Sequence, residues 1–375
     1  MRSKTLVMLA LVTVVIVLAA IVTRQQSTAI PQQNEMLFPQ LLTRINDVTE
    51  VKGTSAEGSY TLLLREGRWV VKEKEAYPAD ADKVRQLLFG LAQLRRVEPK
   101  TSNPELYDQI GVQDVGAKGA ESLQIKLSDV KGGTLAEIIV GKQQLSKADL
   151  SQREYFVRPV DDPQSWLVEG KLPEDKSASN WLRKDILGLN PERVREVRVT
   201  HADGQHLTLR RKDRSARDYE LVGLPTGTEI ESPYAINSIA NTLTDLALDD
   251  VRPASAVDFN KDTLAVELST FDGLRVNMQA IKDGKSDLAR FSASFDPSLI
   301  EKADSTKQET SAAPSEKKSP LKQVDDVRKE AEELNARWHD WVYVIPGYRV
   351  DTIARKKSEL IKVGNKEKPS KPHGG

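Results

Sequence analysis

The chain begins with a long, uncharged apolar stretch, and this stretch constrains everything that follows it. Residues 5–23 read TLVMLALVTVVIVLAAIVT, with threonine as the only polar residue type. A helix rises about 1.5 Å per residue, so this stretch would span roughly 28 Å, close to the roughly 30 Å hydrocarbon core of a bilayer. The sequence therefore predicts a transmembrane anchor over residues 1–24, a linker over residues 25–37 and a water-soluble body after them.

A cleavable signal peptide is the alternative interpretation of the same stretch. The apolar core of a signal peptide usually runs for about 7–15 residues and ends at a small-residue cleavage site. Here the run is longer and the small residues 19–20 lie inside it, which favours a retained anchor. Arg2 and Lys4 with the terminal amine outweigh the single Arg24, so the positive-inside rule places the N-terminus in the cytoplasm. We expect a single-pass protein of the bacterial inner membrane whose body faces the periplasm.

Charge and cysteine content limit the kinds of partner and chemistry. Lysine and arginine number 55 and so do aspartate and glutamate, and there is no cysteine. Nucleic-acid binding needs a basic excess to neutralise phosphates, so this balance argues against it. Without cysteine the chain has no disulfide, no thiolate nucleophile and no thiol to carry a lipid.

The body reads as two copies of one module, at residues 38–188 and 189–362. Each copy runs through three strands, an amphipathic helix, a short charged strand, three more strands, a strand containing tryptophan and a closing helix. In the first copy these elements are expected at 41–51, 60–67, 68–73, 79–94, 95–99, 122–127, 135–141, 154–160, 165–173 and 178–187. In the second copy they are expected at 189–204, 206–213, 218–223, 233–246, 249–253, 264–270, 274–280, 289–295, 340–348 and 349–361.

Antiparallel strands with one helix on the sheet predict an α+β fold, here as two tandem lobes behind the transmembrane helix. Asp80 and Ser232 are the expected N-caps of the two amphipathic helices. The second lobe carries an insertion at about 300–320, which is polar and proline-punctuated and predicts a flexible loop. An apolar stripe follows the insertion, expected to pack on its own lobe, with a partner as the alternative. Residues 363–375 are expected to form a disordered tail.

The stretch AEELNARWHDWVYVIPGYRVDTIARK, residues 331–356, resembles a bacterial family known as domain of unknown function 4340. SWLVEGKLP and NWLRKDILGL repeat its pattern in the first copy. Members of that family tend to be encoded beside an ABC-transporter ATPase, its permease and a protein like the gliding-motility auxiliary component. The resemblance therefore implies an accessory subunit of an envelope transporter, with the permease and the gliding-motility-auxiliary-like membrane protein as partners.

The residue types that carry chemistry do not assemble into a recognisable site. His201 and His206 flank a hairpin turn beside Asp203, but a zinc site needs three or four ligands. A calcium loop starting at Asp258 fails at its sixth and twelfth positions, which are Thr263 and Ser269. The chain has no G-x-S-x-G motif and no phosphate-binding loop. We expect no catalytic residue, no metal and no cofactor, and hence no enzyme.

Aromatic residues are the remaining candidates for a functional surface. Core packing is the first interpretation of a tryptophan at a repeated position, and partner docking is the alternative, because tryptophan and tyrosine are common interface anchors. The candidate docking residues are Trp166, Trp181, Trp338, Trp341, Tyr343 and Tyr348.

These observations predict a membrane-anchored periplasmic adaptor of an ABC-type transporter or envelope complex, which acts by protein–protein interaction. The alternative function is a periplasmic module that binds a lipid or glycan in a cleft between the two lobes.

Overall fold

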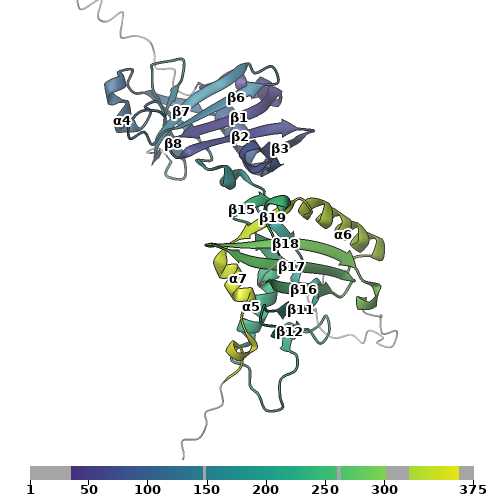
Figure 1. Cartoon of the computed structure of the whole chain (residues 1–375). Coiled ribbons are helices and arrows are strands. Elements are labelled where there is room, and N and C mark those ends of the chain that lie inside the picture. Colours follow the sequence, from purple (N-terminus) through teal and green to yellow (C-terminus); the bar gives the residue numbers. More distant parts are fainter. Residues whose placement is uncertain (1–34, 147–148, 260–262, 301–320, 363–375) are drawn as a thin grey trace, which may run out of the picture. The chain divides into compact units, whose positions relative to one another are not determined.

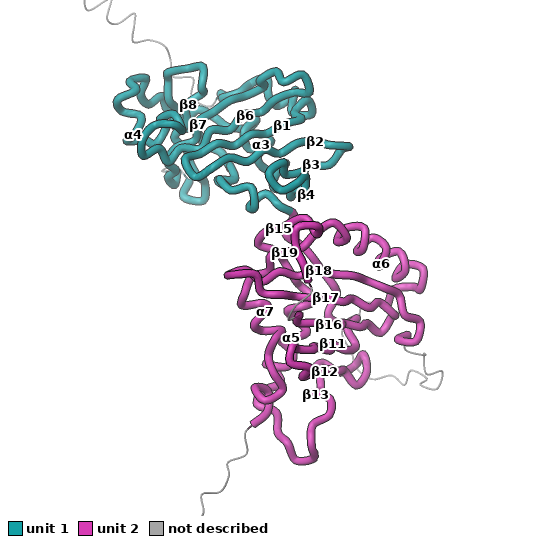
Figure 2. The backbone as a smooth tube through the Cα atoms, in the orientation of Figure 1, with its two compact units in different colours: residues 1–182 teal, residues 183–375 magenta. Residues whose placement is uncertain are grey.

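The computed structural model describes residues 35–146, 149–259, 263–300 and 321–362 (Figure 1). Across these ranges, none of the helices has the length and apolar character needed to span a membrane. The predicted anchor, the tail at 363–375 and the insertion beyond Ile300 lie outside the described residues. The chain divides into two compact units (Figure 2), unit 1 up to Leu182 and unit 2 from Arg183. This division falls six residues before the repeat boundary expected after residue 188.

Unit 1 is built on a nine-stranded sheet in which every neighbouring pair of strands is antiparallel. The strand order is β4-β3-β2-β1-β6-β7-β8-β9-β5. The strands are β1 (Val48–Ser55), β2 (Gly58–Arg65), β3 (Arg68–Val71), β4 (Tyr77–Pro78), β5 (Arg95–Pro99), β6 (Leu123–Asp129), β7 (Thr134–Leu145), β8 (Arg153–Pro159) and β9 (Trp166–Gly170). Its α-helices are α2 (Leu41–Arg44), α3 (Ala81–Ala92) and α4 (Tyr107–Ile110).

Unit 2 is built on an eight-stranded antiparallel sheet with the order β13-β12-β11-β16-β17-β18-β19-β15. The strands are β11 (Val194–Thr200), β12 (His206–Arg210), β13 (Glu220–Leu221), β15 (Asp250–Pro253), β16 (Leu264–Thr270), β17 (Leu274–Asp283), β18 (Ser286–Phe295) and β19 (Trp341–Ile345). A small separate sheet pairs β10 (Asp185–Gly188) with β14 (Asp245–Ala247). The α-helices are α5 (Pro233–Thr244), α6 (Val324–Trp338) and α7 (Gly347–Ile353).

The two sheets have the same connectivity. Each strand of unit 2 can be matched to the strand of unit 1 whose number is lower by ten, so that β11 corresponds to β1 and β19 to β9. With this matching, the strand order of unit 2 is that of unit 1 without β4. Each unit is therefore an α+β module in which a helix follows the third strand of a meander, α3 in one and α5 in the other. The register agrees too, because Gly53 lies between Tyr60 and Ile125 in unit 1 just as Val199 lies between Leu207 and Val266 in unit 2.

Each helix follows from its sequence. The apolar residues of α3 recur at helical spacing, and those at its buried face are Val84, Leu87, Leu88 and Leu91. Asp80 caps this helix, since its carboxylate accepts hydrogen bonds from the backbone N–H groups of Asp82 and Lys83. Ser232 is the N-cap residue of α5, as expected, but its side chain makes no capping hydrogen bond.

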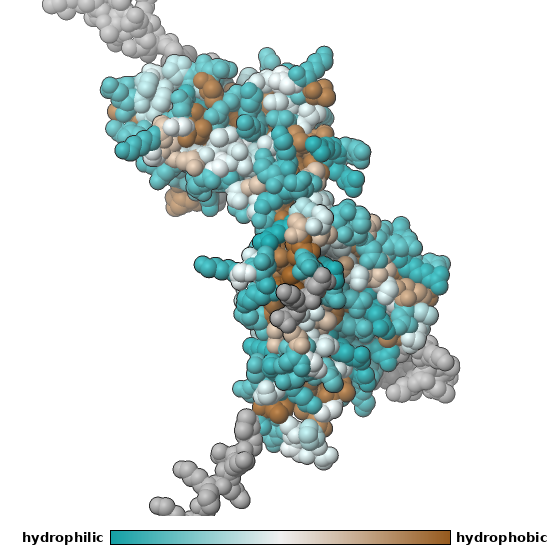
Figure 3. Space-filling view, in the orientation of Figure 1, coloured by the Kyte–Doolittle hydropathy of each residue, from teal (hydrophilic) through white to brown (hydrophobic). Residues whose placement is uncertain are grey.

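Each unit has its larger core on one face of its sheet, and a smaller buried cluster, around Ile139 in unit 1 and around Leu288 and Val342 in unit 2, lies on the other face. In unit 2 the face of the larger core carries Val197, Leu268, Val276 and Ala293, which the register places side by side and which are all buried. Helix α6 packs on β18 and β17 there, with its residues Val327, Ala331, Leu334 and Trp338 buried. The apolar stripe after the insertion is thus covered by its own unit, apart from Val324, which is exposed. On the visible surface in Figure 3, hydrophobic residues are scattered among hydrophilic ones.

Several expected elements differ from the structure. The first seven residues of the strand expected at 41–51 form α2 and a 3-10 turn (Ile45–Asp47), and β1 begins only at Val48. The closing helix expected at 349–361 is α7, which ends at Ile353. The segment 178–187, expected as a helix, forms a single 3-10 turn (Ala178–Trp181) and then β10. Pairing with β14 gives the backbone of β10 hydrogen-bond partners, so a tertiary contact overrides the local helical pattern. The expected strand at 218–223 has only Glu220 and Leu221 in β13.

Candidate functional site

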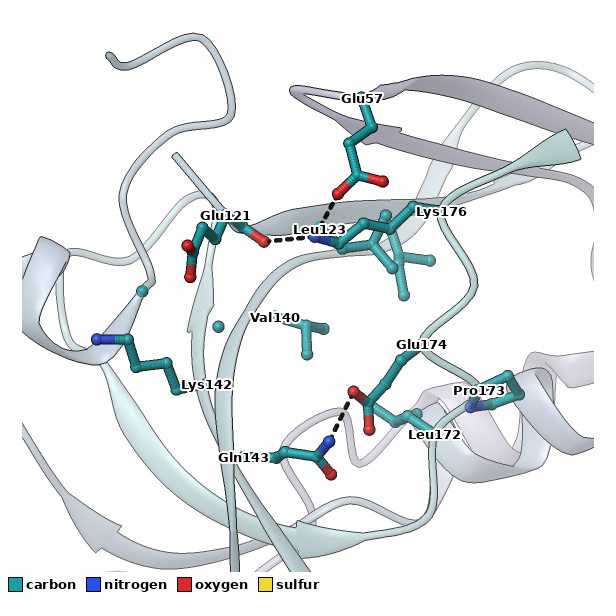
Figure 4. A pocket seen from close by; sticks show the side chains of 13 residues that line it. Glu57, Glu121, Leu123, Val140, Lys142, Gln143, Leu172, Pro173, Glu174 and Lys176 are labelled. Carbon is teal, nitrogen blue, oxygen red and sulfur yellow. Dashed lines mark hydrogen bonds and ion pairs between the residues drawn. The ribbon is translucent and has the colours of Figure 1, made fainter. Parts of the chain in front are cut away.

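A pocket of about 360 Å³ opens in unit 1 beside strands β6 and β7. Its floor is aliphatic, and the buried side chains of Leu123, Ile125, Val140 and Leu172 form it. Figure 4 shows Leu123, Val140 and Leu172 gathered around this hollow. The volume lies within the range of about 300–1,000 Å³ that is typical of ligand pockets. The floor suits an apolar group of another molecule.

A β-bulge shapes one wall of the pocket. Two residues of β7, Gly141 and Lys142, stand between successive pairs with β8 where the partner strand has a single residue. Bulges bend a strand and redirect its side chains, and they occur often beside functional sites. A Cβ atom on Gly141 would lie 2.5 Å from the carbonyl oxygen of Ile110, so only glycine lets the loop after α4 approach this strand.

Charged side chains of both signs surround the floor. The Lys176 ammonium donates to the Glu121 carbonyl at 3.0 Å and pairs with the Glu57 carboxylate at 3.2 Å. On the opposite side, the Gln143 amide donates to Glu174 at 2.9 Å. All three contacts are drawn in Figure 4. The rim of the pocket holds three glutamates and two lysines, so it carries a slight excess of negative charge. These residues are Glu57, Glu121, Glu174, Lys142 and Lys176.

Burial perturbs the acidic groups nearest the floor. It raises the pKa of the Glu174 carboxyl, and Arg153, whose guanidinium lies 3.6 Å away, partly offsets this effect. Burial also raises the pKa of the Tyr155 phenol. The Tyr155 hydroxyl accepts a hydrogen bond from the Leu172 backbone at 3.3 Å, which fixes Leu172 in the pocket floor.

The six aromatic docking candidates separate into three groups. Trp181, Trp338 and Tyr343 are each at most 1% exposed, so core packing describes them. Trp166 and Trp341 are half-buried. The Arg96 guanidinium lies 4.6 Å from the centre of the Trp166 ring. Tyr348 is 66% exposed at the start of α7.

The candidates for metal binding belong to the other unit. His201 and His206 are in the β11–β12 hairpin of unit 2. The carboxylate of Asp203 between them pairs with the Lys356 ammonium at 2.6 Å, and that hydrogen bond lowers the pKa of Asp203. Nowhere in the described ranges do three or more histidine, aspartate or glutamate side chains come together as a metal site would require. The segment proposed as a calcium loop includes residues 260–262, outside the described ranges.

Sequence patterns missed the pocket because its lining comes from distant parts of the chain. The sequence did hold one signal, the different length of one corresponding segment in the two copies. Five residues, 171–175, separate β9 from Lys176 in unit 1, whereas ten residues, 346–355, separate β19 from Lys356 in unit 2. The two lysines make equivalent contacts, since each binds an acidic residue in the first hairpin turn of its unit.

Unit 2 also holds a buried ionic cluster that no sequence pattern marks. The Arg193 guanidinium binds Asp272 at 2.8 Å and Glu330 at 2.7 Å, and the Thr270 hydroxyl donates to Asp272 at 2.5 Å. Lys322 adds a second cation, 3.0 Å from Glu330. This cluster ties α6 to the start of β11 and to the β16–β17 turn, so its role is structural.

The fold and the pocket define a class: a protein of two tandem α+β units, one of which holds an aliphatic pocket with a charged rim. The family model for the domain of unknown function DUF4340 matches residues 69–266, and the chain belongs to this family. The match runs from β3 in unit 1 to β16 in unit 2 and does not include residues 331–356. No curated protein and no solved structure shows a significant match to the chain.

Proposed function

We propose that this protein is a membrane-tethered, non-enzymatic accessory subunit of an ABC-type transporter or a related envelope complex. Residues 5–23 would hold it in the inner membrane with the N-terminus in the cytoplasm and both units in the periplasm. The uncharged apolar run and the flanking Arg2 and Lys4 support this topology. The transporter permease and a gliding-motility-auxiliary-like membrane protein are the proposed partners.

The observation that carries the proposal is the pocket of unit 1. Aliphatic side chains line a hollow there, with paired charges around it. Partner proteins commonly anchor an apolar side chain in such a pocket, where desolvated contacts contribute most of the binding free energy. A subunit that works by interaction needs a surface of this kind.

Affinity purification of the full chain from detergent-solubilised membranes tests the proposal. We expect the unaltered chain to recover the permease, and we expect Gln143→Trp, which places a ring over the pocket from an exposed position, to reduce that recovery about tenfold or more. Val140→Phe, which fills the floor, is the second variant. Lys282→Trp on the exposed end of β17 in unit 2 is the matched control and should recover as much as the unaltered chain. Recovery of no transporter subunit by the unaltered chain would refute the proposal.

A further inference from the structure

Apart from the insertion and helix α6 between β18 and β19 of unit 2, the two units also differ where the chain leaves the last strand of each copy. In both units this segment returns to the first hairpin turn and fastens there through a lysine: Lys176 to Glu57 in unit 1, and Lys356 to Asp203 in unit 2. The shared connectivity makes these two salt bridges equivalent. The two return segments therefore cross the corresponding ends of their sheets.

In unit 2 the return segment contains helix α7. This helix packs on α5 and β18, and Figure 1 shows it alongside α5. Its buried side chains are Val350 and Ile353, which are three residues apart and so share one face of the helix. The Arg349 guanidinium, next to this face, donates to the carbonyl of Asp245 at the end of α5. An aliphatic pair and one basic residue thus complete this end of unit 2.

In unit 1 the return segment is five residues shorter and contains no helix between β9 and Lys176. The pocket lies directly against it, since Leu172, Pro173, Glu174 and Lys176 line one side. The opposite side is formed by β6, β7 and the hairpin turn at Glu57. The hollow in unit 1 therefore lies beside the shorter return segment, whose longer counterpart in unit 2 carries a helix.

We infer that the unit 1 pocket binds a short helical segment of a partner protein, with two aliphatic side chains at positions i and i+3. Helix α7 shows the chemistry that fits, because an equivalent end of the same fold is completed by Val350 and Ile353. The three glutamates and two lysines of the rim favour a segment with one basic residue, as α7 has in Arg349. This inference rests on the proposed function and specifies the chemistry of its docking site.

The test uses a synthetic peptide of residues 346–356, PGYRVDTIARK, with a cysteine added at its N-terminus. The chain has no cysteine of its own, so Lys142→Cys in the detergent-solubilised full chain gives a single thiol at the pocket rim. Disulfide capture in excess mercaptoethanol is measured by mass spectrometry. We expect at least tenfold more capture of this peptide than of one carrying Val350→Asp and Ile353→Asp, because two aliphatic contacts are lost.

Lys282→Cys in unit 2 is the matched control and should capture both peptides equally. Gln143→Trp combined with Lys142→Cys should remove the preference. Equal capture of the two peptides at position 142 would overturn the inference. It would also be overturned if dodecanoate, but not the peptide, protected that thiol from maleimide, because this result would assign the pocket to a lipid. Neither result affects the test of co-purification with the permease. Failure of the peptide-binding inference can therefore be distinguished from failure of the proposed function.

Discussion

Replacing Arg193 with alanine should lower the free energy of unfolding of unit 2 by about 3–5 kcal/mol. Arg193 is 6% exposed, and its guanidinium lies between the carboxylates of Asp272, itself 3% exposed, and Glu330. Removing it leaves two carboxylates in a largely dry environment without their principal cation. Urea unfolding followed by circular dichroism, with hydrogen exchange to assign the transition to unit 2, measures the loss.

The pH dependence of this effect has a definite sign. Burial alone would raise the pKa of Asp272 and of Glu330. Hydrogen bonds and charge from Arg193, with further hydrogen bonds from Thr270 and Lys322, outweigh this effect, so both pKa values are lowered. Carboxyl groups with lowered pKa values stabilise the fold above their unfolded pKa values, about 3.9 and 4.3, and this stability is lost as the pH falls through the folded values. In Arg193→Ala, protonation of the same two carboxyl groups stabilises the folded state. The difference in the free energy of unfolding between this variant and the unaltered chain should therefore shrink toward acidic pH.

Arg252→Ala is the control for this prediction. Its partner Asp283 lies 2.7 Å away, but both side chains are exposed, so solvent screens the pair. Exposed pairs of this kind contribute about 0–1 kcal/mol. A loss below about 1 kcal/mol for Arg193→Ala, equal to that of Arg252→Ala, would show that the cluster does not hold α6 in place.

Replacing Trp338 with alanine should destabilise unit 2 by about 3–5 kcal/mol. The indole is 1% exposed, its ring centre lies 5.4 Å from that of Phe291, and its N–H donates to the carbonyl of Ile186 at 3.1 Å. The substitution opens a cavity under α6 and leaves that buried carbonyl without this donor. We expect the amides of α6 to lose hydrogen-exchange protection before those of β16 and β17.

Tyr348→Ala is the matched aromatic control, since its ring is 66% exposed and its loss should change stability by less than about 0.5 kcal/mol. Trp338→Phe separates packing from hydrogen bonding, because it keeps most of the apolar contact and removes the N–H donor. An unchanged unfolding free energy for Trp338→Ala would mean that α6 does not depend on this ring.

Much of the fold could be predicted because apolar spacing follows local structure. The period of α3 and the alternation in β6 and β16 are set by one buried face each, and both are visible in the sequence. The segment around Trp181 and Ile186 shows the limit of this reasoning. Its apolar residues fit a helical spacing, but they are buried by a 3-10 turn and by pairing of β10 with β14, which depends on residues more than 50 positions away.

The pocket could not be predicted in the same way. Its floor combines β6 and β7 with Leu172, and its shape depends on a bulge at Gly141 that no local pattern marks. The residues chosen from sequence were large aromatics, and three of the six serve the cores of their units instead. Duplication was the informative signal, because comparison of two copies shows where one lacks a helix that the other has.

A single-cysteine labelling experiment in intact cells tests the central claim most directly. Lys142→Cys and Lys285→Cys are both at exposed positions, one at the pocket rim and one in the β17–β18 turn of unit 2. A maleimide that cannot cross the inner membrane should label position 285 in intact cells, should label position 142 weakly there, and should label both in the purified chain. Labelling of position 285 only after lysis would contradict a periplasmic body, and equal labelling of both positions in cells would contradict an occupied pocket.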